Sequence, residues 1–143
     1  MSATIDTNLL VYASDTRSDR HETAEALIRR LAAGPDILYL FWPVLLGYLR
    51  IVTHAGILTT PLSPAVAMRN IESLLDRPHV RVPGELDGFW PVFRRTAGER
   101  PRGNDVPDAH LAALMRQHGV RLLWTSDRDF RRFEGIEARD PFA

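Results

Sequence analysis

Short apolar runs along the chain alternate with longer segments in which apolar residues recur every three or four positions. The apolar runs predict short strands at residues 4–5, 37–41, 79–82, 120–124 and 136–138. The longer segments predict helices within residues 9–12, 24–31, 43–52, 63–75, 86–93 and 107–118, and a short helical turn at 127–133. Because strands that alternate with helices pair in parallel, this pattern predicts an α/β protein whose central, mainly parallel sheet is covered by helices on both faces.

Polar residues mark the expected starts of two helices. Asp19 and Glu22 stand three positions apart and predict a capping box before the helix at 24–31. Asp105 is expected to cap the helix that Pro107 opens. Acidic side chains at these positions are also favoured by the helix dipole.

The composition fits one compact domain over residues 1–143. Hydrophobic residues make up 45% of the chain, which argues against disorder. No cysteine is present, which excludes disulfide scaffolds, thiolate metal sites and cysteine nucleophiles. The 18 basic residues, all arginine, balance 18 acidic ones, so any contact with nucleic acid must come from a local patch.

The sequence shows no secretory or membrane-spanning segment. Residues 1–6 lack the basic region and apolar core of a signal peptide. The longest mostly apolar stretch, 37–49, is interrupted by Pro43 and Gly47 and is too short to cross a bilayer. We therefore expect a cytoplasmic protein without a membrane partner.

Three acidic residues are expected to converge at one edge of the sheet. Asp6 follows the first strand directly, and Asp127 follows the strand at 120–124. The carboxyl ends of parallel strands share one edge, which is where functional residues collect in such sheets. Asp108 lies in the first turn of its helix and shares a face with the apolar Leu111, so its side chain is expected to point inward.

Such a cluster suits a divalent cation. Carboxylates that converge with no basic residue fixed among them repel one another, and Mg²⁺ or Mn²⁺ relieves that repulsion with oxygen ligands. An ion of this kind activates water and clamps phosphodiester oxygens, which is the chemistry of phosphodiester hydrolysis. A simpler interpretation remains open, because each of these acids could merely cap a helix. A receiver-type phosphoacceptor domain also gathers acids at strand ends, but it needs a lysine, and the chain has none.

Arginines flank the expected acidic cluster on both sides. Arg94, Arg95, Arg100 and Arg102 precede it and are candidates to hold an RNA backbone, although a solvated surface is an equally good interpretation. A second group, Arg128, Arg131 and Arg132, follows Asp127. The spacing of Trp42, Trp90 and Trp124 is typical of core residues, so base stacking is the less favoured use of each.

These motifs resemble those of the PIN-domain nucleases, most closely the VapC-type toxins of bacterial toxin–antitoxin pairs. The matching segments are residues 5–10, 107–114, 118–119, 125–130 and 140–142. Their order and spacing match across nearly the whole chain. Each motif is short, but their succession is fairly specific.

The resemblance implies a three-layer α/β/α sandwich that binds Mg²⁺ or Mn²⁺ and cleaves RNA endonucleolytically. It implies that Asp6, Asp108 and Asp127 are the metal ligands and catalytic acids. It further implies a toxin that a cognate VapB-like antitoxin neutralises, and a homodimer or a toxin–antitoxin hetero-oligomer. Auxiliary roles are expected for Asp105 and then Asp129, and candidates to orient carboxylates or waters are Thr7, Asn8, Thr125 and Ser126.

One family position differs. Gly47, before Tyr48-Leu49-Arg50, stands where the family usually has a glutamate, and no acid occurs between Asp36 and Glu72. The alternative function is therefore a catalytically weakened PIN-fold module that acts through RNA or antitoxin binding.

An antitoxin needs a docking surface, and one helix offers more apolar surface than a single core stripe requires. Its apolar residues are Trp42, Leu45, Tyr48, Leu49 and Val52. Some of these, together with the helix at 24–31, are expected to form a groove for an antitoxin helix or tail.

Overall fold

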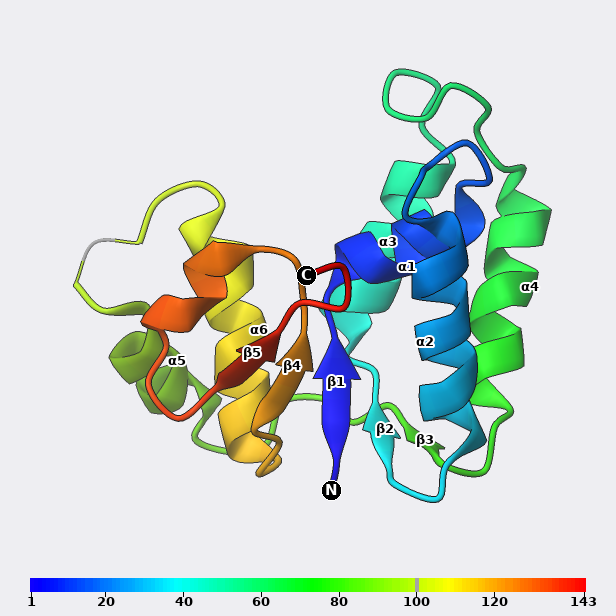
Figure 1. The fold of residues 1–143 in the computed structure, drawn as a ribbon. Helices are drawn as coiled ribbons and strands as arrows, with labels where there is room; N and C mark the ends of the chain where they lie inside the picture. Colours follow the sequence, from blue (N-terminus) through cyan, green and yellow to red (C-terminus); the bar gives the residue numbers. More distant parts are fainter. Residues whose placement is uncertain (100) are drawn as a thin grey trace.

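The computed structural model describes residues 1–99 and 101–143, and its centre is a five-stranded parallel sheet (Figure 1). The strands are β1 (Ala3–Ile5), β2 (Leu38–Tyr39), β3 (Val80–Arg81), β4 (Leu122–Trp124) and β5 (Glu137–Arg139). They lie in the order β3-β2-β1-β4-β5, and every neighbouring pair is parallel. The predicted parallel sheet is confirmed.

Helices pack on both faces of this sheet. They are α1 (Thr7–Ser14), α2 (His21–Ala33), α3 (Trp42–Val52), α4 (Pro64–Leu75), α5 (Phe89–Ala97), α6 (Asp105–Gln117) and the 3₁₀ turn η1 (Arg128–Arg132). His118, just after α6, stacks on Tyr39 of β2, whereas Arg30 of α2 lies over Trp124 of β4. Tyr39 pairs with Thr4 and Trp124 pairs with the next residue of β1, so the two rings point to opposite faces. The α/β/α sandwich is therefore confirmed.

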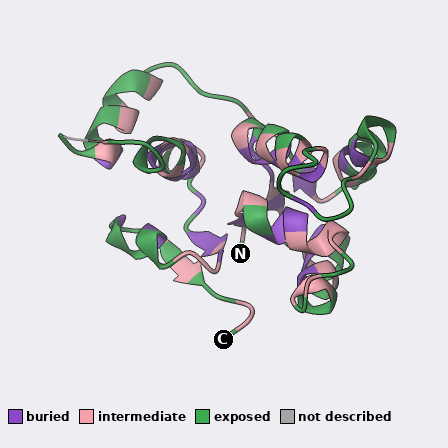
Figure 2. Cartoon of the chain, turned by 90° about the horizontal axis from the view of Figure 1, so that it is seen from above, coloured by how far each residue is buried: buried purple, intermediate pink, exposed green. Residues whose placement is uncertain are grey.

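The core explains why such short strands form. Buried residues gather along the middle of the molecule, on the sheet and on the helix faces turned toward it (Figure 2). All three residues of β1 are buried, as expected for a central parallel strand with helices on both sides. Helix α6 adds a nearly continuous buried run at residues 111–115. Among the described helices, none combines the length and apolarity required to cross a membrane.

Two predicted helix starts are wrong. Helix α2 begins at His21 with Arg20 at its N-cap and no side-chain cap bond, because the Ser18 hydroxyl instead accepts from the Arg20 amide in the preceding turn. Helix α6 begins two residues before Pro107, with Asn104 at its N-cap, so Asp105 is its first helical residue rather than its cap. The Asp105 side chain is thereby free to turn back toward Arg102.

The prediction that the tryptophans lie in the core is wrong for two of the three. Trp42 is 44% exposed and Trp90 is 65% exposed, whereas Trp124 is half-buried on the sheet. Trp42 is the first residue of α3, ahead of the buried face that begins at Val44. On α5, Phe89 packs against the hydrophobic core, and Trp90, the next residue, lies on the outer side of the helix.

Candidate functional site

Asp6 lies at the end of β1, beside β4, at the position where the order of the strands in the sheet reverses. Its backbone amide donates to the Trp124 carbonyl at 3.0 Å, which ties the end of β1 to β4. Its carboxylate caps α1 through the Thr7 amide at 2.7 Å and accepts from the Thr125 hydroxyl at 2.9 Å. A switch point of this kind is where α/β sheets bind ligands.

Asp127 is held beside Asp6 by a shared neighbour. The Thr125 hydroxyl, which donates to Asp6, also accepts from the Asp127 amide at 3.0 Å. Asp127 Oδ1 in turn accepts from the Asp129 amide at 2.9 Å and caps η1. Thr125 is only 3% exposed, so this buried hydroxyl links the two acidic residues and fixes the loop that carries them.

Asp108 completes the cluster from the first turn of α6. Asp108, Asp127 and Asp129 each place one carboxylate oxygen so that all three oxygens lie within 4.8 Å of one another. Asp6, Asp108 and Asp127 also line one pocket of about 540 Å³, hereafter the acidic pocket. The structure thus places the three acids expected to converge in one pocket, whereas the group of close carboxylate oxygens includes Asp129 and does not include Asp6.

The auxiliary residues divide between the pocket and its surroundings. Thr7 and Asn8 line the acidic pocket, although the Thr7 hydroxyl donates to the Val44 carbonyl at 3.3 Å. Ser126 instead accepts from Arg20 at 3.4 Å. Asp105 lies outside the oxygen cluster, because its carboxylate accepts from the Arg102 amide at 3.4 Å and pairs with a guanidinium.

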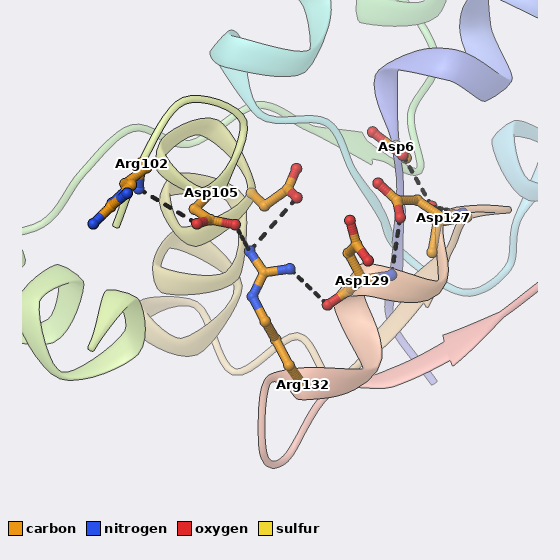
Figure 3. Close-up of polar contacts among 8 residues, drawn as sticks. Asp6, Arg102, Asp105, Asp127, Asp129 and Arg132 are labelled. Carbon is orange, nitrogen blue, oxygen red and sulfur yellow. Dashed lines mark hydrogen bonds and ion pairs between the residues drawn. The ribbon is translucent and has the colours of Figure 1, made fainter. Parts of the chain in front are cut away.

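That guanidinium belongs to Arg132, and it corrects the expectation that no basic residue is fixed among the acids. Arg132 Nη2 lies 3.3 Å from Asp105 Oδ1 and 3.6 Å from Asp108 Oδ2, and Nη1 donates to the Asp129 carbonyl at 2.8 Å (Figure 3). The tight η1 turn brings Arg132 back over Asp129, three residues earlier, and its guanidinium packs 4.3 Å from the Phe133 ring. Sequence reasoning missed this contact because it depends on the direction of one turn.

Burial and mutual repulsion raise the free energy needed to ionise the carboxyl groups of the acidic pocket. Burial and, after it, the Asp127 charge raise the pKa of Asp108, and Arg132 lowers it only in part, so that this pKa is about 6. Burial also raises the pKa of Asp6, against the lowering effect of the Thr125 hydrogen bond. A bound cation would remove this penalty.

We predict that Asp108→Asn stabilises the metal-free protein at neutral pH. The Asp108 pKa is about 6 when folded against an ordinary 3.8, so the folded state holds this proton more tightly. The unfolding free energy should therefore fall as pH rises from about 4 to 6, by about 3 kcal/mol from this group. Asparagine carries no charge and removes that loss.

Urea unfolding in EDTA at pH 4 and at pH 7.5 measures this effect. The wild type should lose more stability between the two pH values than Asp108→Asn does. The exposed Asp105, changed to Asn, is the matched control and should behave as the wild type. Equal pH dependence of the wild type and Asp108→Asn would contradict the buried position of this carboxylate.

The donor set fits a hard divalent cation. The converging atoms in the described chain are carboxylate oxygens, at separations that one ion and its hydration shell can span. No sulfur ligand is available, because the chain has no cysteine. Arg132 lowers the pKa of Asp108, but burial and the neighbouring carboxylates outweigh it, so a cation would still stabilise the ionised carboxylate.

Gly47 lines the same pocket from α3. A Cβ atom at this position would lie 3.3 Å from the Thr7 hydroxyl oxygen, so α3 and α1 approach each other closely here. Arg50 also lines the acidic pocket, one turn further along α3. The sequence pattern does not predict that Arg50 lines this pocket, because the family motif at this position points only to the absent glutamate.

The structure describes three of the four arginines that are expected to contact RNA. Arg94 and Arg95 are exposed on α5 and line a hollow with Trp90. Arg102 is exposed beside Asp105, at the start of α6. Arg100 lies outside the described residues.

Comparisons with known proteins agree on the fold and on a named activity. The PIN domain family model matches residues 3–136. Ribonuclease VapC48 of Mycobacterium tuberculosis is 57% identical over 144 residues, covering 100% of this chain and 99% of that protein. The structure resembles that of M. tuberculosis VapC20, a sarcin–ricin loop cleaving toxin, with TM-score 0.67, 19% identity and coverage of 94% and 98%. It also resembles VapBC2 from Rickettsia felis bound to a promoter DNA fragment, with TM-score 0.70, 15% identity and 98% coverage of both chains.

Proposed function

This chain belongs to the PIN domain family, and from that premise we propose that it is an endoribonuclease toxin that hydrolyses RNA phosphodiester bonds with Mg²⁺ or Mn²⁺. A relative named as a ribonuclease shares 57% identity over the whole chain, which supports the activity. The single observation that carries the proposal is the meeting of Asp6, Asp108 and Asp127 in one pocket. We further propose that residues 1–143 act as one domain.

The residues of the acidic pocket have distinct roles in this proposal. Asp6, Asp108 and Asp127 hold the cation, directly or through its waters. A bound divalent ion supplies a more acidic water and neutralises charge on the phosphate. Thr125 orients the Asp6 carboxylate by donating to it and positions Asp127 by accepting from its backbone amide. Asp129, which lies in the oxygen cluster, takes the auxiliary role in preference to Asp105.

Cleavage of labelled RNA by the purified protein tests the activity. Product should appear with Mn²⁺ or Mg²⁺, stop when EDTA is added and return when excess Mn²⁺ is restored. Cleavage that persists in EDTA would contradict the metal requirement. An inert protein with every divalent ion would contradict the proposed activity itself.

We also propose that an antitoxin docks on the surface between α1, α2, α3 and α4. A groove of about 170 Å³ lies there, and its lining is mostly apolar: Leu10, Ala13, Ser14, Ile28, Leu45, Tyr48, Asn70, Ile71, Ser73 and Leu74. Leu45 and Tyr48 thus contribute as expected, whereas Trp42 does not line the groove. The protein encoded beside this chain should co-purify with it and suppress RNA cleavage. A toxin that stays uninhibited by that protein would contradict the assignment.

The alternative function, a catalytically weakened module, is tested at Gly47. Because Asp129 already adds a fourth carboxylate near the site, we expect Gly47→Glu to change the cleavage rate by less than about threefold. The added Cβ meets Thr7 at 3.3 Å, a contact that a small shift relieves. Gly47→Gln is the control for size without charge. A gain of more than about tenfold for glutamate alone would show that the natural site is degraded.

A further inference from the structure

Helix α5 presents a large aromatic side chain to solvent. Trp90 is 65% exposed, which is unusual for an indole unless it serves a contact. The ring is nevertheless held in place, because it stacks on Phe93 with centroids 5.5 Å apart and planes 23° from parallel. Phe93 in turn contacts Phe89 at 6.1 Å, and Phe89 contacts His110 of α6 at 5.6 Å. This row of rings fixes Trp90 as a platform on the outer face of α5.

The platform borders a basic hollow. Trp90, Arg94 and Arg95 line a space of about 700 Å³, which Pro91, Gly98 and Glu99 complete. Both arginines are exposed, and in the described part of the chain neither forms an ion pair. An aromatic face beside two available guanidinium groups is the combination that binds single-stranded nucleic acid.

The position of α5 connects this hollow with the acidic pocket. Helix α5 packs against α6, whose first turn carries Asp108. The chain leaves α5 at Ala97 and reaches the start of α6 within residues 98–104. An RNA strand held at α5 is therefore bound to the neighbour of the helix that supplies a carboxylate to the pocket.

We propose that the hollow on α5 binds one nucleotide of a single-stranded RNA, with its base stacked on Trp90 and its phosphate held by Arg94 and Arg95. This inference rests on the proposed function. It states that the protein recognises a nucleotide of its RNA substrate away from the bond that is cleaved. The hollow is lined by two arginines and one acidic residue, Glu99, and this local positive charge complements an RNA phosphate, whereas a second copy of this chain has no overall charge of the opposite sign. It also reverses the expectation that Trp90 belongs to the core.

Binding of a fluorescent single-stranded RNA 12-mer to the Asp108→Asn variant tests the proposal without cleavage. Trp90→Ala should weaken binding at least about fivefold, whereas Trp90→Phe, which keeps a stacking face, should stay within about threefold. Arg94→Gln with Arg95→Gln should reduce the slope of log affinity against log salt by about 0.7, since the two arginines are proposed to hold one phosphate and each phosphate contact on a single strand contributes about 0.7. Met68→Ala and Arg69→Gln, exposed on α4, are the matched controls and should have no effect.

Three results would overturn the proposal. Unchanged RNA affinity and salt slope in the α5 variants, while the wild type still cleaves RNA, would remove this site and leave the proposed function intact. A change in molar mass for Trp90→Ala, measured by light scattering at constant RNA affinity, would assign the face to a second copy instead. If neither the wild type cleaves RNA nor Asp108→Asn binds it, both this inference and the proposed function fail.

Discussion

Asp6→Asn and Asp108→Asn are each expected to lower Mn²⁺-dependent RNA cleavage by more than about a hundredfold. Both carboxylates line the acidic pocket, and each approaches it from a different element, β1 or α6. An amide oxygen keeps the shape of the side chain but not its charge. Losing one charged ligand removes part of the several kcal/mol that an ion contributes to phosphoryl chemistry, and each 1.4 kcal/mol is tenfold in rate.

The comparison that makes this result informative is Asp105→Asn. Asp105 belongs to the same turn of α6 as Asp108, but its carboxylate faces Arg102 and Arg132 instead of the oxygen cluster. We expect cleavage to change by less than about fivefold in this variant, because its charge acts on the site only through Arg132. Full activity in Asp6→Asn or Asp108→Asn would eliminate the proposed ligand set.

Thr125→Val is expected to lower cleavage by about ten- to a hundredfold. The Thr125 side chain is not itself a proposed metal ligand, and it acts on two proposed ligands through hydrogen bonds. The substitution keeps the volume and removes both the donor to Asp6 and the acceptor for the Asp127 amide. Partners that orient metal ligands typically contribute this much to affinity or activity. Loss of the donor also raises the pKa of Asp6 further, since the Thr125 hydrogen bond lowers this pKa more than the Thr7 amide does.

Thr125→Ser is the matched control, because it retains the hydroxyl and should keep most of the activity. Calorimetric titration with Mn²⁺ should show weaker binding for the valine variant and near-normal binding for serine. Circular dichroism checks that both variants are folded, which matters because Thr125 is buried. A valine variant with wild-type Mn²⁺ affinity would show that Thr125 serves the fold alone.

The sheet and its acidic edge could be predicted from sequence because both depend on simple periodic rules. A central parallel strand is buried on both faces, so β1 and β4 appear as apolar runs. Asp6 and Asp127 follow those runs, and the carboxyl ends of parallel strands meet at one edge. Asp108 followed from the inward face of its helix, and its side chain is only 18% exposed.

The remaining features depend on the direction of individual side chains, which periodicity does not determine. Arg132 reaches the acids only because η1 is a tight 3₁₀ turn that returns it over Asp129. Asp105 turns away from the pocket because α6 begins two residues before Pro107, which makes Asp105 the first helical residue. Trp90 lies on the outer side of a short helix, where a hydrophobic residue is compatible with either core or contact.

Crystals soaked in Mn²⁺ and measured at an energy with strong anomalous scattering from manganese test the central claim most directly. The account predicts an anomalous peak in the acidic pocket, with Asp6, Asp108 and Asp127 as ligands, directly or through coordinated water. An ordered ion bound elsewhere, or a pocket that stays empty at millimolar Mn²⁺, would contradict it.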